Sequence, residues 1–199
     1  MTANRAKKEP QLICIIGAES TGKTTLARTL AAYFGCPWVP EYLREFCDAH
    51  GRTPTRDEQP QILETQHLAE LTAQQNATER EAPFVFCDTA PLLTAIYSDF
   101  IFADPSLYGR ARVLHSRYAL TLLLATDLAW TADGLQRDGE QVREPITQMI
   151  HQELGNLAAP FVTIMGQGED RISSAIEALS LNNRRANFDG VCSKAMKTS

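Results

Sequence analysis

The sequence has no long hydrophobic run and no segment typical of a secretory signal. The apolar stretch at residues 12–16 is far too short to cross a bilayer, which takes about 20 residues. Residues 1–8 are not followed by the apolar core that a signal peptide needs. We therefore expect a cytoplasmic protein with no membrane partner.

The sequence also lacks an excess of positive charge, and it has no paired cysteine motif. The chain has 19 Lys and Arg against 24 Asp and Glu, whereas sequence-independent binding to nucleic acid needs a basic surface. Its five cysteines are scattered, and none belongs to a Cys-x-x-Cys pair that would nucleate a zinc site. We expect reduced thiols, no nucleic-acid partner and no zinc centre.

What is present is a series of five short apolar runs separated by helical patterns. The runs lie at residues 12–16, 38–40, 84–87, 118–124 and 161–165. Helical spacing follows at 23–34, at 57–80, where the polar face is rich in Gln and Glu, and from Pro91 onward. Short strands buried on both faces and alternating with helices are typical of an α/β protein with a five-stranded, mostly parallel sheet.

The turn after the first run carries the motif G-x-x-x-x-G-K-T at residues 17–24. A glycine-containing turn that enters a helix directs backbone N–H groups at a phosphate, while the lysine reaches the outer phosphates and the hydroxyl binds Mg²⁺. Because the motif follows a strand and opens a helix, we predict a Walker A P-loop that binds ATP with magnesium. The predicted nucleotide-binding residues are Gly17, Glu19, Ser20, Thr21, Gly22, Lys23, Thr24 and Thr25.

The motif and the order of elements together predict a P-loop NTPase-type three-layer sandwich with helices on both faces of the sheet. We place the P-loop kinase domain at residues 11–181, between an N-terminal extension at 1–10 and a loose or docked C-terminal tail at 182–199. No Asn-Lys-x-Asp motif for guanine occurs, and the chain has little room for the sensor segments of an AAA-type motor. A small-molecule kinase is therefore favoured.

Two carboxylates follow predicted strands. Glu41 comes after the second run and Asp88 after the third. Since ligands bind beyond the carboxyl ends of parallel strands, we expect Glu41, Asp88 and the P-loop to face one crevice, with an acceptor hydroxyl between the carboxylates. Either carboxylate can serve as the general base, and the ring of Tyr42 can stack on an aromatic acceptor.

Asp88 is also the Walker B candidate, predicted to share Mg²⁺ with the hydroxyl of Thr24. The alternative role for Asp88 is the N-cap of the helix that Pro91 opens.

Residues 131–145 contain glycines and two arginines, and we predict that they form a lid over the phosphates. Arg137 and Arg143 would join Lys23 in supplying positive charge to the transferred phosphoryl group. The alternative is a solvated loop in which Arg137 pairs with Asp138 or Glu140.

Four segments together resemble the ribosylnicotinamide kinase domain of NadR-type proteins: G-A-E-S-T-G-K-T-T at 17–25, E-Y-x-R-E-F at 41–46, Asp88-Thr89, and L-L-L-A-T-D-L-A-W-T-A-D-G at 122–134. The resemblance implies ATP-dependent phosphorylation of the 5′-hydroxyl of nicotinamide riboside, a salvage step toward NAD. It also implies that Lys23 and Thr24 serve ATP and magnesium, and that the lid arginines close over the phosphates. The predicted substrate-binding residues are Glu41, Tyr42, Arg44, Asp88 and Trp130.

Two other functions remain open from the sequence. One is a P-loop kinase for another nucleoside or a cofactor precursor, and the other is a non-catalytic nucleotide-sensing module. The sequence makes no prediction of the oligomeric state.

Overall fold

The computed structural model describes residues 9–131 and 139–196 of the chain. Its centre is a five-stranded sheet in the order β2-β3-β1-β4-β5, in which every neighbouring pair of strands is parallel. The strands are β1 (Gln11–Ile16), β2 (Trp38–Val39), β3 (Phe84–Asp88), β4 (Tyr118–Leu124) and β5 (Phe161–Ile164). The predicted parallel sheet is confirmed.

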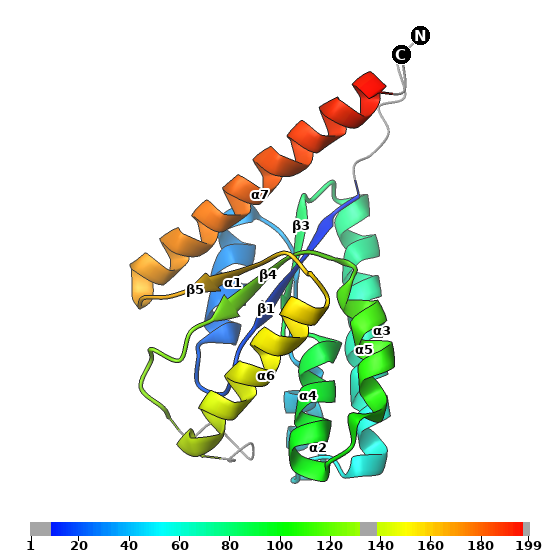
Figure 1. Cartoon of the computed structure of the whole chain (residues 1–199), viewed down its shortest axis with the longest axis vertical. Helices are drawn as coiled ribbons and strands as arrows, with labels where there is room; N and C mark the ends of the chain where they lie inside the picture. Colours follow the sequence, from blue (N-terminus) through cyan, green and yellow to red (C-terminus); the bar gives the residue numbers. More distant parts are fainter. Residues whose placement is uncertain (1–8, 132–138, 197–199) are drawn as a thin grey trace.

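Helices cover both faces of this sheet (Figure 1). They are α1 (Lys23–Phe34), α2 (Tyr42–His50), α3 (Gln59–Glu79), α4 (Pro91–Phe102), α5 (Tyr108–His115), α6 (Arg143–Asn156) and α7 (Gly168–Met196), with short 3-10 helices at Arg56–Glu58, Pro105–Leu107 and Glu140–Val142. Alternate residues of β1 face opposite layers: Ile13 and Ile15 pack with α1 and α7, whereas Cys14 and Ile16 pack with α3 to α6. The three-layer sandwich is confirmed.

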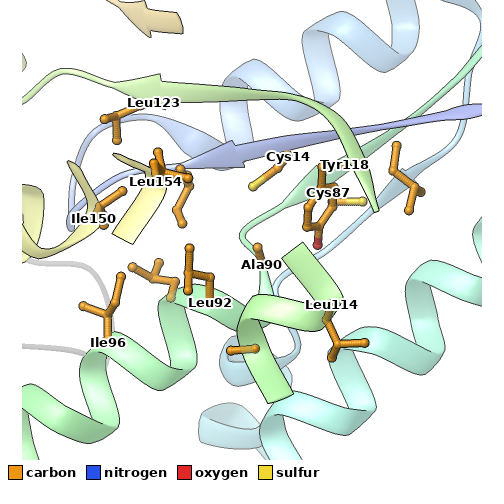
Figure 2. Close-up of a cluster of buried hydrophobic side chains, with 14 of the residues drawn as sticks. Cys14, Cys87, Ala90, Leu92, Ile96, Leu114, Tyr118, Leu123, Ile150 and Leu154 are labelled. Carbon is orange, nitrogen blue, oxygen red and sulfur yellow. The ribbon is translucent and has the colours of Figure 1, made fainter. Parts of the chain in front are cut away.

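The core beneath α3 to α6 is shown in Figure 2, where Cys14 and Cys87 come from the neighbouring strands β1 and β3. Both thiols are fully buried, and burial raises the pKa of each well above its ordinary value. They therefore act as small hydrophobic side chains rather than nucleophiles. Cys36 and Cys47 are also free thiols.

The C-terminal segment is helical, and the division of the chain into a domain at 11–181 and a tail at 182–199 stays a prediction. The predicted break at residue 181 falls inside α7, which continues to Met196 and extends past the end of the sheet (Figure 1). Its first turns pack on the sheet, and no proline or glycine interrupts residues 169–189, so the helix continues beyond the body that it covers. Residues 197–199 lie outside the described part of the chain.

Residues Tyr42–His50 form the regular helix α2, which was not predicted from the sequence. None of the described helices is long and apolar enough to cross a membrane.

The polar face predicted on residues 57–80 is partly buried. Gln59, Gln66 and Glu70 of α3 are 6%, 2% and 1% exposed. Glu70 lies under β4, where the hydroxyl of Tyr118 donates a hydrogen bond of 2.6 Å to its carboxylate and Arg117 lies 3.6 Å away. Burial raises the pKa of Glu70 to about 7, against the opposing effects of Tyr118, Arg117 and Gln66.

The raised pKa of Glu70 predicts a pH-dependent stability. Between its ordinary pKa of 4.5 and about 7, the unfolded chain releases this proton while the folded chain retains it. Rising pH therefore destabilises the folded state, and the full cost is present above about pH 7. Glu70→Gln removes that cost, so its free energy of unfolding relative to the unsubstituted protein should increase by about 2 to 3 kcal/mol from pH 5 to pH 8.

Denaturant unfolding at the two pH values measures this difference. Glu79→Gln, at an exposed position of the same helix, is the control. If both variants gave the same dependence on pH, burial of Glu70 would not be its cause.

Candidate active site

The P-loop is a tight turn between β1 and α1 that leaves no room for a side chain at its first glycine. A Cβ on Gly17 would lie 2.9 Å from the Thr21 hydroxyl and 3.1 Å from the Leu124 carbonyl oxygen of β4. Gly22, directly before α1, has a φ of 83°, in the left-handed region that favours glycine. The glycines of the motif therefore allow the loop to pack against β4 and to enter the helix.

A cavity of about 380 Å³ opens over this loop and the start of α1. It is lined by Ser20, Thr21, Gly22, Lys23, Thr24, Thr25, Arg44, Leu128, Ala129 and Thr131. No side chain caps the N-terminus of α1. The backbone N–H groups of the first turn, the hydroxyls and two cationic side chains thus surround one space, which suits the phosphates of a nucleotide. We refer to it as the phosphate cavity.

Asp88 lies at the end of β3, next to the first turn of α1. The hydroxyl of Thr24 donates a hydrogen bond of 2.5 Å to its Oδ2. Burial raises the pKa of Asp88, while the Thr24 hydrogen bond and the charges of Lys23 and Arg44 act in the opposite direction. The alternative role as a helix cap is wrong, because Ala90 is the N-cap residue of α4.

The pair formed by Thr24 and Asp88 fits a magnesium ion. Oδ1 of Asp88 is buried and has no hydrogen-bond partner within the described residues, so a hard oxygen ligand is available beside the hydroxyl. Mg²⁺ is typically held by one or two protein oxygens together with substrate phosphates and water. In the described part of the chain, no group of three or more His, Cys, Asp or Glu could hold a metal alone. Any ion here would therefore depend on bound phosphate.

A second cavity, of about 340 Å³, shares Lys23 with the phosphate cavity. It is lined by Glu19, Lys23, Glu41, Leu43, Thr53, Pro54, Thr55, Gln59, Ile62, Gln66, Thr89, Leu93, Thr94, Tyr97, Ile101 and Phe102. Its charged groups come from the P-loop and from Glu41, the residue before α2, and α3 and α4 supply most of its apolar wall. We refer to it as the acceptor cavity.

Lys23 lines both cavities, and its Nζ donates a hydrogen bond of 3.2 Å to the Ala18 carbonyl oxygen within the P-loop. The structure therefore brings Lys23 and Glu41 to one space, as the sequence predicts. Arg44 instead lines the phosphate cavity, and Asp88 lines neither cavity. The two predicted carboxylates thus occupy different surroundings.

Two predicted substrate-binding aromatics line neither cavity. The backbone N–H of Tyr42 donates a hydrogen bond of 2.8 Å to Oε1 of Gln66, and the ring is half-buried. Trp130 is also half-buried, and its Nε1 has no hydrogen-bond partner within the described residues. Contact of either ring with a ligand stays a prediction.

The predicted lid is described only at its two ends, and Arg137 lies outside the described residues. At the first end, the hydroxyl of Ser20 donates a hydrogen bond of 2.6 Å to the Thr131 carbonyl oxygen, so this segment contacts the P-loop. At the other end, Arg143 is 5% exposed, and its Nη2 donates a hydrogen bond of 3.0 Å to the Leu128 carbonyl oxygen. Arg143 lines neither cavity.

A buried arginine that was not predicted from the sequence binds the backbone of the P-loop. Arg171 of α7 donates to the carbonyl oxygens of Thr21 in the P-loop and Gly166 after β5, and to the carboxylate of Asp127 after β4. Asp127 also accepts a hydrogen bond of 2.7 Å from the Gly166 N–H. Asp127 follows a predicted strand, as Glu41 and Asp88 do, but no local pattern marks Arg171.

The fold and the two cavities define a P-loop nucleotide-binding protein. The model of a family described as "AAA domain" matches residues 12–171. The chain belongs to this AAA domain family. It matches no curated protein.

Several solved structures share the fold. A NadR protein in complex with NR has a TM-score of 0.68 and 21% identity, over 87% of this chain and 51% of that chain. Thymidylate kinase from Ehrlichia chaffeensis has a TM-score of 0.62 and 14% identity, over 87% of this chain and 99% of that chain. Deoxyadenosine kinase from M. mycoides has a TM-score of 0.55 and 13% identity, over 87% and 100%.

The chain spans about half the length of the NadR chain that it resembles. At these identities the likeness establishes the fold of P-loop kinases, and the resemblance to NadR-type proteins inferred from the sequence is confirmed at that level.

The contacts of Arg171 predict that it shapes the P-loop as well as stabilising the body. Arg171→Met leaves the Asp127 carboxylate with the Gly166 N–H alone and removes the side-chain donor from two carbonyl oxygens, so we expect a loss of about 2 to 3 kcal/mol in the free energy of unfolding. We also expect ATP to bind about tenfold more weakly, because the Thr21 carbonyl is no longer held. Denaturant unfolding and calorimetric titration with ATP measure the two effects.

Arg184→Met, at an exposed position of the same helix, is the matched control and should change neither quantity. An Arg171→Met protein that lost stability but bound ATP like the control would disprove the effect on the loop.

Proposed function

We propose that this chain is an ATP-dependent kinase that phosphorylates the 5′-hydroxyl of nicotinamide riboside to give nicotinamide mononucleotide, a step of NAD salvage. The observation that carries the proposal is that Lys23 of the P-loop and Glu41 line the same cavity. A nucleotide switch needs a phosphate site alone. A kinase also needs an acceptor site next to the phosphate site, and the position of the second cavity supports that role.

The arrangement around Lys23 supports a two-substrate reaction. ATP would bind with its phosphates in the phosphate cavity, and the nucleoside would occupy the acceptor cavity, so that Lys23 lies between donor and acceptor. Phosphoryl transfer demands mainly alignment of the reacting groups and positive charge around the transferred phosphoryl group. Lys23 and Arg44 lie where they can supply that charge, and we propose that Arg137 and Arg143 add to it.

The different surroundings of the two carboxylates support different roles. Glu41 lines the acceptor cavity and is 8% exposed, so it is suited to accept the proton of the acceptor hydroxyl. Asp88 accepts a hydrogen bond from the hydroxyl of Thr24, which lines the phosphate cavity, so Asp88 is suited to bind the metal ion. We propose that Glu41 is the general base and that Thr24 and Asp88 hold Mg²⁺, which when bound neutralises charge on the outer phosphates.

The acceptor cavity supports a nucleoside-like substrate. Its volume of about 340 Å³ lies at the lower end of the range of small-molecule sites, roughly 300 to 1,000 Å³. Its charged end suits a ribose hydroxyl that must approach ATP, and its apolar wall suits a planar ring. The likeness to the NadR structure in complex with NR adds nicotinamide riboside as the first candidate.

The proposal predicts different effects on ATP binding for two substitutions that both lower turnover. Glu41→Gln should lower kcat for nicotinamide riboside by about a hundredfold or more while leaving ATP binding nearly unchanged, because it removes a general base. Lys23→Met should abolish turnover and also weaken ATP binding. The measurement is formation of nicotinamide mononucleotide from nicotinamide riboside and ATP, with ATP affinity determined by calorimetry.

Asp48→Asn, at an exposed position of α2, is the control for changes near Glu41 and should retain full activity. If the unsubstituted protein formed no nicotinamide mononucleotide but phosphorylated another nucleoside, the assignment of the acceptor would be wrong. If no nucleoside accelerated consumption of ATP, the kinase proposal itself would fail.

A further inference from the structure

Gln66 lies on the wall of the acceptor cavity with half of its amide unpaired. The side chain is 2% exposed and belongs to the middle of α3. Its Oε1 accepts a hydrogen bond of 2.8 Å from the backbone N–H of Tyr42, in the first turn of α2. Its Nε2 is buried and has no hydrogen-bond partner within the described residues. A donor is thus enclosed next to a cavity that is large enough for a ligand.

The hydrogen bond to Tyr42 fixes which way the amide faces. Only the oxygen of an amide can accept from a backbone N–H, so the nitrogen must be the other atom. Gln66 also contacts Glu70, one turn further along α3, and has the smallest of the effects that lower the pKa of that carboxyl. An amide nitrogen carries two hydrogens, so a contact with Glu70 leaves a second hydrogen for another acceptor.

Buried donors without a partner are uncommon in folded proteins, because each one costs free energy of desolvation. At the wall of a cavity, a bound ligand can supply the missing acceptor. The remaining wall is suited to hold a ring beside Gln66, since Leu93, Tyr97 and Phe102 of α4 line the same cavity. The position of Glu41 on this cavity favours placement of the sugar hydroxyl toward the P-loop.

We infer that Gln66 is a specificity-determining residue, whose Nε2 donates a hydrogen bond to a carbonyl oxygen carried by the ring of the phosphoryl acceptor. The inference rests on the proposed function and narrows it to nucleosides whose ring bears a carboxamide or a ring carbonyl. A site that pairs a buried polar group with its substrate discriminates strongly against an analogue that lacks the partner atom. Gln66 therefore selects among acceptors and has no part in the proton transfer.

Gln66→Glu tests this role with the smallest change in shape. In its ionised form the carboxylate still accepts the Tyr42 N–H and so preserves the link between α3 and α2, but it has no hydrogen to donate. Two acceptors are compared: nicotinamide riboside, and the corresponding pyridinium riboside without the carboxamide. We expect kcat/KM to fall about ten- to a hundredfold for nicotinamide riboside, mostly through KM, and less than about threefold for the analogue.

Gln61→Glu, at an exposed position of the same helix, is the control and should behave like the unsubstituted protein with both acceptors. Because Gln66→Glu puts a second carboxyl group near Glu70, where burial favours a protonated form that can still donate, Gln66→Met is measured as a second variant. It also lacks the donor, and it should produce the same difference between the two acceptors.

Equal losses for both acceptors would overturn the inference, since Gln66 would then act only as a structural link to α2. This outcome is distinct from failure of the proposed function, in which the unsubstituted protein forms no product from nicotinamide riboside. If a different nucleoside is the substrate, the same comparison is made with that nucleoside and its analogue without the ring carbonyl. If no nucleoside is phosphorylated, both proposals are wrong.

Discussion

The close contact of the P-loop with the strands and helix around it is the constraint on which the rest of the site depends. The loop is held from three sides: Gly17 packs against the backbone of β4, Thr24 binds Asp88 at the end of β3, and Thr21 binds Arg171 of α7. Backbone N–H groups bind a phosphate well only when their directions are fixed before the ligand arrives. The parallel sheet supplies that rigidity, because neighbouring strands end at the same edge.

Lys23 of this rigid loop lines both cavities, and under the proposed function it would lie between the two substrates. The phosphate cavity is rich in hydroxyls and positive charge, whereas the acceptor cavity joins a charged end to an apolar wall made by α3 and α4. Gln66 ties α3 to the start of α2, directly beside Glu41. The same side chain thus links the position of the proposed base to the wall that would contact the acceptor ring.

Much of the fold and part of the site could be predicted from local patterns. The helix at 23–34 and the strand at 118–124 were predicted with the same bounds as in the structure. Both predictions were possible because an apolar run and helical spacing can be recognised from neighbouring residues alone. The position of Glu41 near the P-loop could also be predicted, because the carboxyl ends of parallel strands lie at the same edge of the sheet. Gln66 belongs to the polar face predicted on residues 57–80, and its burial could not be predicted because it depends on packing of α3 against other segments. Arg171 and Thr21 are 150 positions apart, so no local pattern could join them.

The central claim is that a nucleoside occupies the acceptor cavity with its hydroxyl between Glu41 and the phosphates held by Lys23. A crystal structure of the protein with nicotinamide riboside, magnesium and a non-hydrolysable ATP analogue tests it most directly. The account predicts the 5′-hydroxyl oxygen within about 3 Å of the Glu41 carboxylate and facing the outer phosphate of the analogue. Nicotinamide riboside bound outside this cavity, or bound with its 5′-hydroxyl turned away from both Glu41 and the phosphates, would contradict it.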